Sequence, residues 1–149
     1  MASEDRCTFS QVISSLIELE SMIAEFYKAS VERSQASGSK EIFLTFEKAN
    51  RWRIISLDRV RRETVVEMSL EPIMGLALEE HRLHVRQVIE DKNLDDRQRA
   101  IALEDIMQGI YSEASRKLEY VSAEAFDLLN RFSLESSRRM DMLVAGNRA

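Results

Sequence analysis

The chain has 149 residues, with only one proline, four glycines and one cysteine. A β-sandwich or barrel needs a turn signal about every 8–12 residues, and a phosphate-binding loop needs clustered glycines, so this composition excludes both and predicts a few long helices. The formal net charge of −5, from 21 basic and 26 acidic residues, disfavours non-specific nucleic-acid binding, which depends on a basic face.

The N-terminal segment is acidic and lacks the apolar stretch of a signal peptide. The longest apolar run, Ile73 to Leu78, is far shorter than the roughly 20 residues that a membrane span needs. The single cysteine, Cys7, provides neither a disulfide framework nor a Cys-x-x-Cys metal motif. These features predict one all-α domain over residues 1–149 of a soluble cytoplasmic protein, with no membrane or nucleic-acid partner.

The first half of the chain predicts a helical hairpin. Apolar residues at helical spacing indicate a helix over about 10–33, with Ser10 as its N-cap. The serine-rich stretch 34–39 predicts a loop. A second helix then extends over about 40–69, and Pro72 is expected to stop it.

A long connection and a second hairpin follow. Residues 70–94 are expected to form a crossover that is helical in part, over about 76–89, but has poor periodicity. A third helix is predicted over about 95–119, because two aspartates at its start suit a helix N-terminus. The fourth is predicted over about 122–145, with Ser122 as its cap.

An internal repeat supports two hairpins. A Glu-x6-Tyr motif occurs in the first helix, Glu20 to Tyr27, and again in the third, Glu104 to Tyr111. The next expected core aromatic follows at a similar distance in each half: Phe43 and Phe126. Two related hairpins joined by a long crossover predict an up-down four-helix bundle.

Two glutamates are predicted to point into the core of this bundle. On a helical wheel Glu20 lies within the apolar arc of its helix, and Glu104 lies at the edge of its own. A carboxylate on an apolar stripe is costly unless it is paired. Two inward carboxylates at matching positions of a repeat are what a carboxylate-bridged dimetal site requires, so Glu20 and Glu104 are candidate metal ligands.

At this point the chain resembles the rubrerythrin/ferritin-like superfamily, specifically its short rubrerythrin-type bundles. The resemblance covers roughly residues 10–144. It rests on the two Glu-x6-Tyr motifs, on the segment from Asp95 to Tyr111 and on the long crossover. It implies a ferritin-like bundle with a diiron site, in which Glu-x-x-His motifs on the second and fourth helices supply the remaining ligands.

The chain departs from the family pattern at those remaining ligands. Alignment on the apolar landmarks puts Asn50 and Arg53 at the two positions in the second helix, and Ser133 and Ser136 at those in the fourth. Only two of the six implied ligands remain, and both histidines are replaced. The resemblance therefore implies the fold without the usual metal chemistry.

We hypothesise that a buried Glu20–Arg53–Glu104 cluster replaces the metal. Arginine keeps its proton and does not bind metal, but it can neutralise carboxylates through bidentate hydrogen bonds. Three further side chains are expected to complete the hydrogen bonding: Asn50, Ser133 and Ser136. The predicted function is that of a non-enzymatic structural or protein-interaction module without a cofactor.

Two metal-binding alternatives stay open. Glu47 and Glu135 lie close to the expected ligand positions, so a rebuilt site using them would make the chain a diiron oxidoreductase, an oxidase or a peroxidase with iron as cofactor. The only histidines, His81 and His84, could bind zinc or nickel weakly together with Glu80. A solvated charged helix face is the preferred interpretation of that segment.

The second helix carries a second apolar stripe outside its core face. Its residues are Trp52, Ile54 and Ile55. An exposed apolar stripe marks an interaction site or is covered by another part of the chain. The stripe therefore predicts either a homodimer through the second helix or burial under the crossover.

Overall fold

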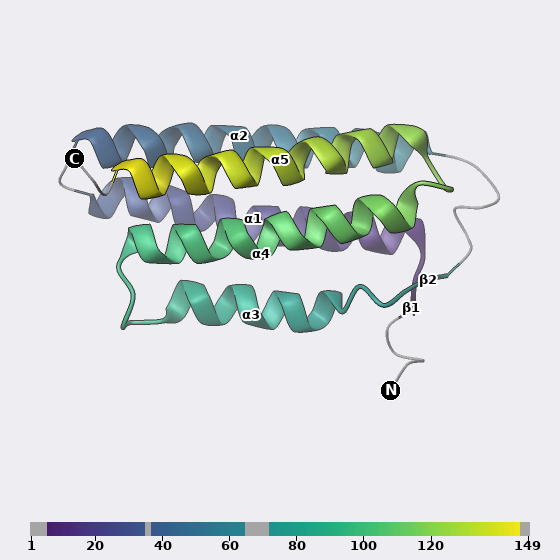
Figure 1. Cartoon of the computed structure of the whole chain (residues 1–149), viewed down its shortest axis with the longest axis horizontal. Helices are drawn as coiled ribbons and strands as arrows, with labels where there is room; N and C mark the ends of the chain where they lie inside the picture. Colours follow the sequence, from purple (N-terminus) through teal and green to yellow (C-terminus); the bar gives the residue numbers. More distant parts are fainter. Residues whose placement is uncertain (1–5, 35–36, 65–71, 147–149) are drawn as a thin grey trace.

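A computed structural model describes residues 6–34, 37–64 and 72–146 of the chain. Within these residues the protein is all-helical apart from two strands of two residues, which confirms the all-α prediction (Figure 1). The elements in chain order are β1 (Arg6–Cys7), α1 (Phe9–Arg33), α2 (Ser37–Glu63), β2 (Ile73–Met74), α3 (Leu78–Glu90), α4 (Asp96–Leu118) and α5 (Ala123–Gly146).

The four long helices lie side by side as two antiparallel hairpins (Figure 1). Helix α1 packs mainly against α2, and α4 packs mainly against α5. The short helix α3 packs against α4 and α1 and lies on the opposite side of the molecule from α2 and α5. The crossover therefore covers one side of the four long helices.

Capping boxes fix the starts of α1 and α4. The hydroxyl of Thr8 accepts a hydrogen bond from the backbone N–H of Gln11 (3.1 Å), and the Gln11 side chain accepts one from the N–H of Thr8 (2.8 Å). The prediction of Ser10 as the cap was wrong, because the reciprocal bonds favour a start two residues earlier. Asp95 and Gln98 make the same pair of bonds at α4, where the predicted start is confirmed.

The predicted bounds of the second helix were wrong at both ends. Helix α2 begins at Ser37, inside the predicted loop, and ends at Glu63. Thr64 opens a β-branched Thr-Val-Val stretch whose low helix propensity favours an end before Pro72 is reached. Residues 65–69 of the predicted helix lie outside the described residues.

The break between α4 and α5 is where the sequence predicts it. The hydroxyl of Ser122 accepts a hydrogen bond from the backbone N–H of Ala125 (3.0 Å), as an N-cap does. The helical part of the crossover is also confirmed, with α3 at 78–90 instead of 76–89. A two-residue antiparallel ribbon, β1 with β2, joins the segment before α1 to the segment before α3.

One apolar core runs through the molecule and includes side chains from all five described helices. Phe126, which the repeat predicted to be a core aromatic, is only half-buried. In α5 the inward positions belong to Ala125, Leu129 and Phe132, which turns Phe126 partly outward. Among the described residues, none of the helices combines the length and the apolar character that crossing a membrane requires.

Candidate functional site

A group of polar side chains is buried among the four long helices, where packing alone would place apolar residues. We call this group the polar centre. Each member is at most 5% exposed. The members are Glu20 and Tyr27 of α1, Asn50 and Arg53 of α2, Glu104 and Tyr111 of α4, and Ser136 and Arg139 of α5.

The first half of the polar centre is built around Glu20. Its Oε1 accepts hydrogen bonds from Nη1 of Arg53 (3.1 Å) and from the hydroxyl of Tyr111. Arg53 also donates to Oε1 of Glu135 from Nε and Nη2 (both 3.4 Å) and to the backbone carbonyl of Phe132 from Nη2 (3.3 Å). The predicted contact between Glu20 and Arg53 is therefore present.

The second half is built around Glu104. Its Oε2 accepts hydrogen bonds from the hydroxyl of Tyr27 (2.5 Å) and from Nη1 of Arg139 (3.3 Å). The same Nη1 donates to Oδ1 of Asn50 (2.5 Å). The arginine paired with Glu104 is therefore Arg139, which the sequence analysis missed, and the formal charges of the two glutamates and two arginines cancel.

The two halves are related by the internal repeat. Each tyrosine of a Glu-x6-Tyr motif donates its hydroxyl to the glutamate of the other motif: Tyr27 to Glu104, and Tyr111 to Glu20. This exchange requires α1 and α4 to be antiparallel and in one register. The repeat seen in the sequence is therefore an approximate two-fold symmetry of the polar centre.

A second repeated motif, Phe-x6-Arg, obeys the same symmetry. It runs from Phe46 to Arg53 in α2 and from Phe132 to Arg139 in α5. Each guanidinium lies over the ring of the other motif, with Arg53 at 5.1 Å from the Phe132 centroid and Arg139 at 5.0 Å from that of Phe46. This spacing is the sequence signal that would have found Arg139.

The same symmetry places the serines of α5. Since Arg139 corresponds to Arg53, the counterpart of Asn50 is Ser136, which belongs to the polar centre. Ser133 lies a turn earlier and donates its hydroxyl to the backbone carbonyl of Gln108 (3.0 Å), outside the polar centre. The expected hydrogen bond of Ser136 to the cluster is not formed, because its Oγ has no partner within the described structure.

Burial and charge set the protonation of the polar centre. Burial raises the pKa of Tyr27 and of Tyr111 well above the ordinary value of 10.0, and the charge of the bonded glutamate raises each further. Burial alone would lower the pKa of Arg53, but the charge of Glu20, together with those of Glu104 and Glu135, raises it above the usual range. Both phenols therefore stay protonated and Arg53 stays charged at neutral pH.

Several atoms of the polar centre have no hydrogen-bond partner within the described residues. They are Glu20 Oε2, Asn50 Nδ2, Glu104 Oε1, Ser136 Oγ and Arg139 Nη2. A buried polar atom without a partner costs about 1–3 kcal/mol. Local violations of this kind are typical of positions kept for a role other than simple packing.

The donor set of the polar centre does not fit a dimetal site. Arg53 and Arg139 face the two glutamates from the neighbouring helices, and a guanidinium has no lone pair to give to a metal. One oxygen of each glutamate already accepts from an arginine and a tyrosine. This geometry does not favour metal binding by Glu20 and Glu104, which stays a prediction.

The other candidate ligands lie outside the polar centre. Glu135 is half-buried and bonded to Arg53, whereas Glu47 pairs with Arg51 in its own helix (3.5 Å). His81 is half-buried and His84 is exposed, both on α3. Among residues 6–34, 37–64 and 72–146, no group of three or more histidine, cysteine, aspartate or glutamate side chains is arranged to hold a metal ion.

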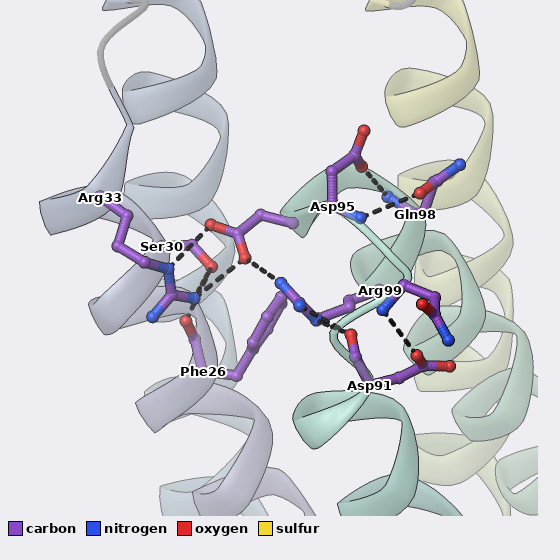
Figure 2. A network of polar contacts seen from close by, with 9 residues as sticks. Phe26, Ser30, Arg33, Asp91, Asp95, Gln98 and Arg99 are labelled. Carbon is purple, nitrogen blue, oxygen red and sulfur yellow. Dashed lines mark hydrogen bonds and ion pairs between the residues drawn. The ribbon is translucent and has the colours of Figure 1, made fainter.

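A second polar network joins the end of α1 to the start of α4 (Figure 2), and its side chains are only partly buried. We call it the end network. Asp96 accepts hydrogen bonds from Arg33 (3.0 and 3.1 Å) and Arg99 (2.8 Å), and Arg99 also donates to the backbone carbonyl of Asp91 (2.7 Å). Partial burial would raise the pKa of Asp96, but the bonds and charges of the two arginines lower it overall.

The predicted apolar stripe of α2 is largely exposed. Trp52 is 68% and Ile55 is 57% exposed, whereas Ile54 is half-buried. Helix α3 packs on α1 and α4 instead. The alternative that the crossover buries this stripe is therefore wrong for the part of the crossover that the structure describes.

Comparison of the chain with protein-family models, with curated proteins and with solved structures found no match in any of the three. The geometry of the polar centre and of the molecular surface therefore carries the functional argument. That geometry is a charge-balanced set of two glutamates, two arginines and two tyrosines inside a helical bundle.

Proposed function

We propose that this chain is a rubrerythrin-type, ferritin-like up-down bundle in which internal ion pairs replace the metal centre. It acts without metal and without catalysis, as a cytoplasmic structural or protein-interaction module. One observation carries this proposal: each buried glutamate is paired with a buried arginine from a neighbouring long helix. Two guanidiniums neutralise the two glutamates, so no metal cation is needed to balance their charge.

The chemistry of the polar centre supports a non-catalytic role. It contains no histidine or cysteine, and both of its glutamates are engaged by a guanidinium and a phenol. A general base must be free to accept a proton at the operating pH, and these carboxylates are held as counter-ions. The role that suits them is to fix the register of the helices, because each ion pair forms only when its two helices are correctly placed.

Metal analysis of the purified protein tests this proposal. The chain is expressed in medium enriched in iron and manganese, and its metal content is measured by mass spectrometry. We expect far less than one metal ion per chain, and a thermal unfolding midpoint that neither a chelator nor added ferrous iron changes.

The alternative, a diiron oxidoreductase that uses Glu47 and Glu135, predicts the opposite outcome. Near-stoichiometric iron or manganese in the wild-type protein, lost in the Glu20→Gln variant, would overturn our proposal. A matched Glu18→Gln variant is the control, because Glu18 lies on the same helix but pairs with Arg82 at the surface. Its metal content should equal that of the wild type in either case.

A further inference from the structure

The two arginines of the polar centre are bonded differently, although the internal repeat relates them. Nη2 of Arg53 donates to Oε1 of Glu135 (3.4 Å) and to the backbone carbonyl of Phe132 (3.3 Å). Nη2 of Arg139 is buried as well, but it has no hydrogen-bond partner within the described residues. A buried donor without an acceptor is costly, so the Arg139 half of the polar centre needs an acceptor that the Arg53 half already has.

The sequence explains this difference between the two halves. Glu135, the outer acceptor for Arg53, lies four residues before Arg139 on α5. The residue four before Arg53 on α2 is Ala49. Under the approximate two-fold symmetry, the contact of Arg53 with Glu135 therefore corresponds to a contact of Arg139 with Ala49. An alanine side chain has no oxygen and cannot accept the hydrogen bond.

Two further buried atoms without partners lie beside Arg139. Its Nη1 donates to Oδ1 of Asn50 (2.5 Å) and to Oε2 of Glu104 (3.3 Å). The other terminal atoms of these two side chains, Asn50 Nδ2 and Glu104 Oε1, have no partner within the described residues. Each of the three unpartnered atoms shares its carbon with an atom of the bonded contact, so all three gather around Nη1 of Arg139. We call Asn50, Glu104 and Arg139 the Arg139 junction.

The unpartnered atoms of the Arg139 junction require a ligand that both donates and accepts hydrogen bonds. A guanidinium only donates, so the Asn50 atom next to Nη1 must be the oxygen, and Nδ2 is thereby fixed as a donor. Nη2 of Arg139 is a second donor, and Oε1 of Glu104 is an acceptor.

This donor and acceptor set selects a neutral ligand. A metal cation in the Arg139 junction would face the hydrogens of two donors, and an anion would face a carboxylate oxygen. Water is the smallest neutral molecule that both donates and accepts. Buried waters typically make about three hydrogen bonds to polar groups that would otherwise have no partner, and the junction offers three such atoms.

We propose that the Arg139 junction is a binding site for one ordered water molecule. The water accepts hydrogen bonds from Asn50 Nδ2 and Arg139 Nη2 and donates one to Glu104 Oε1. It gives Arg139 the acceptor that Glu135 gives to Arg53 in the other half of the polar centre. Since the three side chains come from α2, α4 and α5, the water links the two helical hairpins.

The wild-type protein tests this site directly. A high-resolution crystal structure should show one water within hydrogen-bond distance, about 2.7–3.2 Å, of all three atoms. In solution, nuclear magnetic resonance of labelled protein should show cross-relaxation between the side-chain amide of Asn50 and a long-lived water. A junction that holds no water, or an Asn50 Nδ2 that bonds a protein group directly, would overturn the proposal.

Ala49→Glu tests why the water is needed, because it places a carboxylate at the position that corresponds to Glu135. The signal between Asn50 and water should be lost in this variant. Thr45→Glu is the matched control, since Thr45 is exposed about one turn earlier on α2, and it should keep the signal. A water signal that persists in an Ala49→Glu protein with retained helices would contradict the proposal, and the wild-type measurement stands whether or not this variant folds.

Metal analysis separates this site from the proposed function. A metal-free protein without water at the Arg139 junction would remove the water site and leave the proposed function standing. A metal ion bound to Oε1 of Glu104 would overturn both.

Discussion

The polar centre and the end network are built from the same bond, an arginine donating to a carboxylate, in opposite surroundings. Arg53 is 2% exposed, whereas the side chain of Arg33 is 52% exposed. In the interior, removal of one partner leaves an uncompensated charge and costs about 3–5 kcal/mol. At the surface, water replaces the lost partner and the cost is about 0–1 kcal/mol. Burial, and not the number of ion pairs, therefore decides what such a pair does for the fold.

The two regions also differ in what they specify. The end network joins the end of α1 to the start of α4 beside a capping box that forms locally. The polar centre connects α1 with α2 and α4 with α5, and its tyrosines connect the two hairpins. Of the two regions, only the polar centre has contacts that depend on the register of all four long helices.

The largest expected effect is that of breaking a buried pair. Arg53→Met should lower the free energy of unfolding by about 3–5 kcal/mol, because Glu20 is left buried without its cation. Urea denaturation followed by circular dichroism measures it. The double variant Glu20→Met/Arg53→Met should recover most of the loss, since it removes both charges together.

Arg33→Met in the end network is the matched control, with an expected loss of at most about 1 kcal/mol. Equal losses for Arg33→Met and Arg53→Met would remove the distinction between the two regions. So would a double variant that is no more stable than Arg53→Met alone.

Alkaline pH should affect the polar centre next. The folded-state pKa of Tyr27 and Tyr111 is raised, so their contribution to stability is complete below about pH 10 and is lost as the pH rises further. The loss should approach about 1.4 kcal/mol per pH unit for each tyrosine. Unfolding midpoints between pH 9 and pH 11.5 measure this slope, and Tyr27→Phe/Tyr111→Phe should lack it.

Acid should affect the end network, with a smaller effect. The folded-state pKa of Asp96 is lowered, so its contribution is present above its ordinary value of 3.8 and is lost as the pH falls below it. Asp96→Asn should cost at most about 1 kcal/mol at neutral pH, and this cost should shrink in molar salt. A loss that salt does not change would show that Asp96 behaves like a buried partner.

The smallest effect is expected at Ser136 of α5, and Ser133 of the same helix is its comparison. Ser133→Ala removes a hydrogen bond to a backbone carbonyl and should cost about 0.5–1.5 kcal/mol. Ser136→Ala removes a buried hydroxyl that has no partner in the described structure, so it should be neutral or slightly stabilising. Thermal denaturation of both variants compares them directly, and a costly Ser136→Ala would indicate a hydrogen bond at that hydroxyl.

Much of the fold follows from local signals in the sequence. Apolar periodicity located the long helices and the helical part of the crossover, because one face of each helix must be buried. Helix ends were less predictable. Both Ser10 and Thr8 are acceptable caps, and the reciprocal bond with Gln11 decides between them. The end of α2 was placed too late, because a proline limits a helix without showing where it stops.

The polar centre was only partly predictable. The helical wheel placed Glu20 in the core, and alignment on the apolar landmarks placed Asn50 and Arg53 at ligand positions; all three are buried. Arg139 was missed because the second hairpin was aligned on Phe126, which is half-buried, instead of on Phe132. From tyrosine to phenylalanine the repeat spans 19 residues between Tyr27 and Phe46, but the corresponding span in the second hairpin is 21. Because of this two-residue difference, an alignment that assumes equal spacing pairs the wrong residues of α5 with those of α2.

By itself, the sequence determined that this chain is helical, that it folds as two related hairpins and that it buries carboxylates. These properties depend on residue types at helical spacing along the chain and on a motif that recurs in it, so they can be recognised without knowing how the helices pack. Only the tertiary structure decided which arginine neutralises which glutamate, and that each tyrosine bonds the glutamate of the opposite hairpin. The physical reason is that a buried charge takes its partner from a neighbouring helix, and the register between helices is a property of the packed molecule as a whole.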